Sequence, residues 1–296
     1  LMTLYIIDKI IPLNTETTLK LVTLPLLVSL VPLSTYTLTK PWRKKEAPLA
    51  ALLTIPTAQV LVSIYAGYHA NLLTIPILYI AQTHTIKALE QQNWKNTTTA
   101  SIALTATALT HVWTWQMGTA ILIMYTVLTI ILEKQKPLKK IGILALIITP
   151  SIITDTLRTK LQQPTGITIA YNTVRGKTSL HNLYRLGLNL NFMTNIYVGG
   201  YTVNWLILLL ATIAAITINP KENPLDRLLT AWLITISIIF PVADSVIQSR
   251  LLYNTPIQIL AATGLNKLKN EKTIETLTIL TLMTHSLRST ANMLFP

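Results

Sequence analysis

The chain reads MGTAILIMYTVLTIIL over residues 117–132, an apolar stretch that contains no charged side chain. Comparable apolar stretches recur along its 296 residues, and short charged loops separate them. Long stretches with few charges are typical of helices that cross a membrane, where every backbone polar group needs a partner within its own helix. The sequence therefore predicts an α-helical membrane protein.

The amino-acid composition supports this class and excludes several others. Hydrophobic residues make up 51% of the chain, charged residues only 12%, and the mean hydropathy is +0.49. A soluble domain carries about 25% charged residues, so this chain has too few polar side chains to cover a soluble surface. There is no cysteine, which excludes a disulfide scaffold, a cysteine-based zinc site and a thiol nucleophile.

We expect an all-α, polytopic membrane protein of about nine or ten transmembrane helices, several of them short or hairpin-like. Residues 1–296 are interpreted as a single transmembrane domain. The polar segment 158–192 is expected to be an external loop, and its pattern at 180–192 favours a helix lying in the membrane interface. The apolar stretches are 20–39, 47–83, 98–132, 141–157, 193–218, 228–247, 251–265 and 273–284.

Three interruptions within or between these stretches set the expected helix boundaries. A turn is predicted at 65–71, which would divide 47–83 into two short helices. The stretch 98–132 is either a hairpin or one long helix kinked near its aromatic cluster at 111–115. A polar break is predicted at 248–250, between the stretches that end at 247 and begin at 251.

The distribution of positive charge predicts the topology. Most of the 24 Lys and Arg residues lie in short loops that would share one side of the membrane. Short loops rich in Lys and Arg stay in the cytoplasm, so we expect a multi-pass plasma-membrane protein with these loops inside. The net charge of +13 is then explained without nucleic acid as a partner. The loops are 40–46, 84–97, 133–140, 219–227 and 266–272.

The acidic residues divide into two groups under this topology. Those in or beside the cytoplasmic loops, among them Glu46, Glu90, Glu133 and Asp226, are expected to be solvated loop charges. On the external side, Asp155 and Asp244 lie near helix ends inside apolar stretches, where an ionisable group is costly and is usually paired or functional. Two interpretations stay open for these two: ion pairs, Asp155 with Arg158 and Asp244 with Arg250, or a role in chemistry.

Arginine and histidine residues complete the external set. Arg175, Arg185 and Arg250 suit a phosphate, because the guanidinium fork can chelate two oxygens; nonspecific contact with lipid headgroups is the alternative. His69 and His111 each lie at the tip of an apolar hairpin, flanked by aromatic residues. No second histidine or acid stands at a metal-ligand spacing, so we expect neither a metal site nor a cofactor.

Three segments share a pattern with a known family. They are SIYAGYHANLL at 63–73, ALTHVWTW at 108–115 and QSRLLYNTPIQILAATGL at 248–265. In this order and spacing they resemble segments of archaeal integral membrane proteins of the GT-C glycosyltransferase type, although Val112 stands where proline is common. The resemblance implies a multi-helix enzyme that transfers a sugar from a polyprenyl-phosphate donor at the external face, with Arg250 facing the lipid phosphate.

The resemblance also places a catalytic acid in the first external loop, and this chain has no clear counterpart. Three explanations stay open: N-terminal helices are missing, another acid serves, or the protein is not catalytic. Sugar transfer needs a carboxylate to deprotonate or orient the acceptor, and cations to stabilise the departing phosphate. Asp8 and Asp155 are the candidate bases.

The predicted site thus combines the two candidate bases with arginines and cavity residues. Arg250, Arg185 and Arg175 are the predicted phosphate ligands, and His69, His111 and Asp244 are expected to line the substrate cavity. The expected partners are a polyprenyl-phosphate sugar or another membrane lipid, and other membrane proteins. Two alternatives to an enzyme remain: a non-enzymatic membrane subunit of a larger complex, and a transporter.

Overall fold

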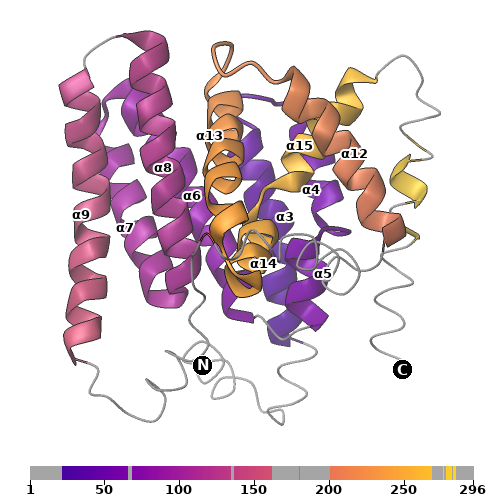
Figure 1. Ribbon diagram of the computed structural model, residues 1–296, viewed down its shortest axis with the longest axis horizontal. Coiled ribbons are helices and arrows are strands. Elements are labelled where there is room, and N and C mark those ends of the chain that lie inside the picture. The colour runs from indigo at the N-terminus through magenta and orange to yellow at the C-terminus, as the bar shows by residue number, and fades with distance from the viewer. Residues whose placement is uncertain are drawn as a thin grey trace.

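A computed structural model describes residues 22–65, 69–134, 137–161 and 201–268, together with residues 180, 276, 278–281 and 283–284. Its secondary structure in these ranges is helical (Figure 1). Three helical segments are long and apolar enough to cross a membrane: Val112–Glu133, Pro137–Leu161 and Pro224–Val242. The predicted helical class is confirmed, and the number of helices that cross a membrane stays a prediction.

The first half of the described chain forms two short helices and five longer ones. They are α3 (Leu24–Thr39), α4 (Ala47–Thr54), α5 (Ala58–Tyr65), α6 (His69–Gln91), α7 (Trp94–Thr110), α8 (Val112–Glu133) and α9 (Pro137–Leu161). The second half contains α12 (Tyr201–Thr217), α13 (Pro224–Ile239), the 3₁₀ turn η4 (Phe240–Val242), α14 (Ser245–Asn254) and α15 (Ile257–Lys267).

The predicted boundaries hold in some places and fail in others. The stretch 98–132 is a hairpin, because α7 and α8 are separate helices joined through His111 alone. Helix α6 continues to Gln91, so the predicted loop 84–97 shrinks to residues 92–93. The charges that suggested a loop lie at the end of α6 (Lys87 and Glu90) and in the first turn of α7 (Lys95). Helix α9 likewise begins at Pro137 within the predicted loop 133–140, because proline is well tolerated in the first turn of a helix.

The break predicted at 248–250 is wrong. Helix α14 is continuous through these residues, and the chain breaks instead around Pro241 and Pro256. Proline has no amide hydrogen and clashes with the preceding turn, so these two residues interrupt the helix where polar side chains do not.

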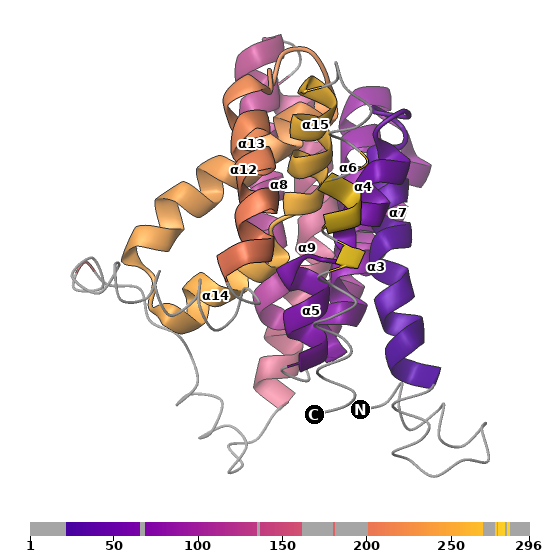
Figure 2. The same ribbon diagram turned by 90° about the vertical axis from the view of Figure 1, so that its right-hand side faces the viewer.

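The helices pack in two groups with α13 between them (Figure 1). Helices α6, α7, α8 and α9 pack against one another, and α15 packs on α4 and α12. Helix α3 packs on both α4 and α6, and α13 packs on α8. In both views α14 lies beneath α13, at the end of the bundle opposite the α12–α13 connection (Figure 2).

The outer surface of α9 is apolar. Large hydrophobic side chains that are about half exposed or more run along it, and in a soluble protein such a continuous patch is rare. Hydroxyl groups in the bundle bond back to the preceding helical turn, as Thr54 does to Ala50 O and Thr107 to Ala103 O, which satisfies them without water. An apolar exterior, and hydroxyl groups that bond within their own helix, fit a lipid environment. The exposed residues of α9 include Leu138, Ile141, Leu146, Ile152, Ile153 and Leu157.

Candidate lipid-phosphate site

The first two family-like segments meet where α6 begins and α7 gives way to α8. Thr114 Oγ1 donates to Asn71 Oδ1 over 3.1 Å, and His111 Nδ1 lies 2.7 Å from Thr114 Oγ1. One helical turn further on, Thr74 Oγ1 donates to Thr110 Oγ1 over 3.0 Å. These hydrogen bonds hold the start of α6 against the α7–α8 corner.

The third segment reaches the same corner through Arg250 of α14. The guanidinium carbon of Arg250 lies 4.8 Å from the centre of the Trp113 ring, within the range of a cation–π interaction. Segments 63–73, 108–115 and 248–265, which are far apart in sequence, therefore converge in the folded chain.

A cavity of about 200 Å³ opens beside this contact, between α8, the end of α13 and α14. Most of its walls are apolar side chains such as Met117, Ile239 and Leu251. Polar groups are contributed by Arg250, Gln116 and Asn254. An apolar cavity that contains one guanidinium is suited to a molecule with a hydrocarbon chain and an anionic head. Its lining is Trp113, Gln116, Met117, Ala120, Ile239, Ile247, Arg250, Leu251 and Asn254.

Side-chain caps determine how the short helix α14 presents Arg250. Asp244 Oδ1 accepts the backbone N–H of Ile247 at 3.1 Å, as an N-cap residue does. Gln248 Nε2 donates to the carbonyl of Phe240 over 2.9 Å, which ties α14 back to the end of α13. Asn254 Nδ2 donates to the carbonyl of Arg250 itself over 2.9 Å.

His111 lies in the one-residue break between α7 and α8, just before the candidate membrane-spanning segment begins. Its Nδ1 accepts the backbone N–H of Thr114 and so caps α8. Burial, and to a smaller extent the positive charge of Arg250, together lower the pKa of His111 from 6.5 to about 4. His111 is therefore neutral at neutral pH beside the charged Arg250.

The structure places the other predicted residues in different surroundings. Asp155 forms an ion pair with Arg158, which also donates to the carbonyl of Ala108 over 2.9 Å. The ion-pair interpretation of Asp155 is thus confirmed, and its role as a base stays a prediction. His69 is half-buried at the start of α6. Asp244 caps α14 and does not line the cavity.

Several predictions fall on parts of the chain that the structure does not describe. Asp8, Arg175 and Arg185 lie outside the described residues, as does the segment 181–192 of the predicted interfacial helix. Within the described ranges, no carboxylate lines the cavity, and no group of three or more His, Asp or Glu side chains is arranged to hold a metal ion.

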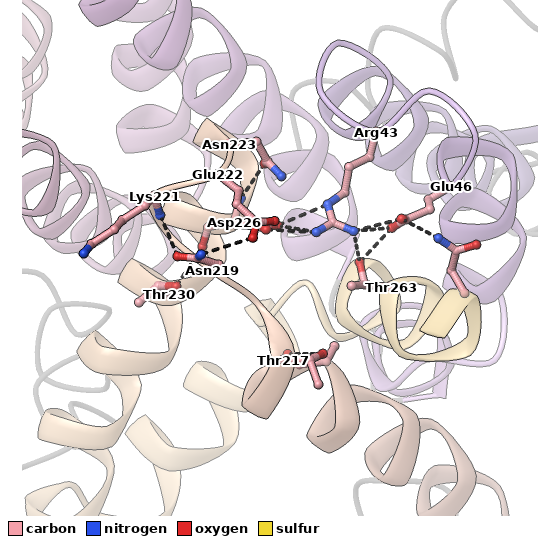
Figure 3. Close-up of polar contacts among 12 residues, drawn as sticks. Arg43, Glu46, Thr217, Asn219, Lys221, Glu222, Asn223, Asp226, Thr230 and Thr263 are labelled. Atoms are coloured by element: carbon pink, nitrogen blue, oxygen red, sulfur yellow. Dashed lines mark hydrogen bonds and ion pairs between the residues drawn. The ribbon is translucent and has the colours of Figure 1, made fainter. Parts of the chain in front are cut away.

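A buried charge cluster at the opposite end of the bundle was missed by the sequence analysis (Figure 3). Arg43 Nη2 lies 2.7 Å from Asp226 Oδ1, and Arg43 Nη1 lies 2.8 Å from Glu46 Oε1. Asp226 is 1% exposed and Glu46 is 8% exposed, so the prediction of solvated loop charges is wrong for both. Thr263 and Asn266 of α15 each donate to Glu46 over 2.9 Å.

A second ion-pair group lies in the same region. Arg227 and Lys140 both pair with Glu133, which connects α13 and α9 to the end of α8. Together with the Arg43 cluster, these contacts bring the predicted loops 40–46, 133–140 and 219–227 to one end of the bundle. These three predicted loops therefore lie close together. Which side of a membrane this end faces stays a prediction.

Neither comparison by sequence adds a relative: no protein-family model matches the chain, and no curated protein matches it. The resemblance of the three segments to GT-C glycosyltransferases is therefore a hypothesis. Its structural support is the contact of Asn71 with Thr114 and of Trp113 with Arg250.

Proposed function

We propose that this protein binds a polyprenyl phosphate at Arg250 and acts as a membrane glycosyltransferase of the GT-C type. The observation that carries the proposal is a mostly apolar cavity that contains the Arg250 guanidinium and lies beside the point where the three segments contact one another. The apolar walls suit an isoprenoid chain, and the guanidinium suits its phosphate.

In this proposal the chemistry proceeds by displacement at the sugar. An acceptor group attacks the anomeric carbon, the bond between that carbon and the phosphate oxygen breaks, and the acceptor's proton passes to a carboxylate. Arg250 stabilises the negative charge that develops on the departing lipid phosphate. The carboxylate comes from Asp8 or Asp155. We further propose a multi-pass plasma-membrane protein with the Arg43 end in the cytoplasm and the cavity at the external face.

Replacing Arg250 tests the proposal directly. The purified protein in detergent is titrated with undecaprenyl phosphate and with the uncharged alcohol undecaprenol, and binding is followed by native mass spectrometry. Arg250→Ala should lose about tenfold or more in affinity for the phosphate, because a hydrogen bond to a charged group contributes about 1.5–3 kcal/mol. Its affinity for the alcohol should stay the same.

Arg158→Ala is the matched control, since it removes a guanidinium that is paired with Asp155 and does not line the cavity. This variant should keep the preference for the phosphate. Equal binding of undecaprenyl phosphate by the wild type and Arg250→Ala would overturn the assignment of the site.

A non-enzymatic lipid-binding subunit is the second candidate. It is favoured by the lack of a carboxylate among the described residues that line the cavity. A protein that binds undecaprenyl phosphate through Arg250, but never transfers a sugar from a lipid-linked donor to any acceptor offered, would fit this candidate better than the enzyme.

A transporter is the third candidate, and the broken helices favour it. Both α4–α5 and α14–α15 are interrupted near a proline, and transporters bind substrates at such discontinuous helices. Reconstituted vesicles that accumulate a labelled sugar phosphate, with no transfer to lipid, would support this candidate.

A further inference from the structure

Helix α14 is detached from its neighbours in the chain at both ends. The 3₁₀ turn at Pro241 separates it from α13, and Pro256 separates it from α15. The direction of this ten-residue helix is therefore not set by a continuous helix on either side. The contacts at the two ends of α14 therefore determine where Arg250 lies relative to Trp113 and the cavity.

The end after Arg250 is held by an amide from another helix. Pro256 has no N–H and cannot continue the helix, so α14 ends at Asn254 and Thr255 lies just beyond it. Gln59 Nε2, from α5, donates to the carbonyl of Thr255 over 2.9 Å. The same carbonyl also accepts the backbone N–H of Ile257 at 2.7 Å, so Gln59 adds a second hydrogen bond, and this one ties the chain after α14 to α5.

Gln59 is itself fixed by a buried network. Gln258 Nε2, from the first turn of α15, donates to Gln59 Oε1 over 2.9 Å, and Gln59 Nε2 donates to the Tyr79 hydroxyl over 3.0 Å. Gln258 also donates to Thr35 Oγ1 over 3.1 Å. These four side chains are at most 1% exposed. Side chains of α6 and α15 thus hold the Gln59 amide directly, and Thr35 of α3 holds Gln258.

We propose that Gln59 is a positioning residue for the lipid-phosphate site. It acts through the Thr255 carbonyl, which fixes the end of α14 and thereby places the Arg250 guanidinium against Trp113 for the phosphate. This inference rests on the proposed function. Gln59 does not line the cavity and needs no contact with the lipid.

The test is the ratio of the affinities for undecaprenyl phosphate and undecaprenol, measured on the full chain. Gln59→Leu should lower this ratio by about tenfold, because a displacement of about 1 Å in a binding group can cost that much or more. Affinity for undecaprenol should stay within about twofold, since the apolar walls remain. A loss of general stability would weaken both ligands alike and leave the ratio unchanged.

Gln82→Leu is the matched control. Gln82 of α6 is fully buried like Gln59, but its amide atoms make no hydrogen bond to the described protein. Its replacement should leave the ratio at the wild-type value. Tyr79→Phe removes one restraint on Gln59 with little change of volume, so it should lower the ratio to a smaller extent. If Gln59→Leu does not fold, the affinity ratio of Tyr79→Phe tests the positioning role of Gln59 instead.

The outcomes separate the two proposals. If Arg250→Ala abolishes the preference for the phosphate while Gln59→Leu and Tyr79→Phe keep it, the positioning role is overturned and the site stands. If the wild-type protein shows no preference for the phosphate, the proposed function fails and the positioning role fails with it. A ratio lowered by Gln82→Leu as much as by Gln59→Leu would also overturn the positioning role.

Discussion

The buried Arg43 cluster makes a sharp prediction about stability. Arg43 donates to both oxygens of Asp226, at 2.7 and 2.9 Å, and to both oxygens of Glu46, at 2.8 and 2.9 Å (Figure 3). Arg43→Met would keep much of the apolar stem and remove the positive charge. The buried carboxylates of Glu46 and Asp226 would then lack their guanidinium partner. Removing one partner of a buried ion pair costs about 3–5 kcal/mol.

The free energy of unfolding can be measured by titrating the protein in mild detergent with sodium dodecyl sulfate. Arg43→Met should lower it by about 3 kcal/mol or more, and adding Asp226→Asn to Arg43→Met should recover part of the loss because one buried charge is removed. Lys221→Met is the control, since Lys221 is exposed and its loss should change stability by less than about 0.5 kcal/mol.

The reasoning would be refuted if Arg43→Met cost less than about 1 kcal/mol, which is the usual contribution of a solvated surface pair. That result would mean that Glu46 and Asp226 reach water in the folded protein. A double variant as unstable as the sum of the two single variants would also contradict the coupling between Arg43 and Asp226.

Three further predictions concern His111, Gly264 and Gly142. Because burial, and then the charge of Arg250, lower the pKa of His111 from 6.5 to about 4, the unfolded chain binds a proton between these pH values that the folded chain does not. As the pH drops from 6.5 to about 4, the Tm of the wild type should therefore fall more than the Tm of His111→Asn, a variant that keeps a capping side chain. Parallel pH profiles of the two proteins would contradict this prediction. Gly264→Ala should destabilise the protein by about 2 kcal/mol or more, because a Cβ there would overlap the carbonyl oxygen of Leu210 on α12. Gly142→Ala meets no atom within 4 Å and should stabilise α9 by about 0.5–1 kcal/mol in the same unfolding assay.

The helical fold could be predicted from the sequence because it depends on a local property. Apolar stretches with few charges form helices wherever they lie, and the α7–α8 hairpin was among the alternatives. The predicted helix boundaries are wrong where they were placed at charged residues and not at prolines. The polar residues around Arg250 suggested a helix break, but the helices are broken at Pro241 and Pro256. Proline has no amide hydrogen and therefore cannot make the helical hydrogen bond.

The candidate site was only partly predictable. The three family-like segments suggested that Arg250 and His111 belong together, and the structure brings both to the α7–α8 corner. The burial of Glu46 and Asp226 was not predictable, because each becomes buried only when the segment between α3 and α4 meets α13 and α15. A clue was available in retrospect: loops expected on one side of a membrane contained opposite charges able to pair.

Helix α8 joins the two polar ends of the molecule. It contains 22 residues and no proline, so it extends about 33 Å. Trp113 near its first turn touches Arg250, and Glu133 at its last turn pairs with Arg227 and Lys140. A ligand that displaced α8 along its axis would therefore also have to displace Glu133 relative to Arg227 and Lys140.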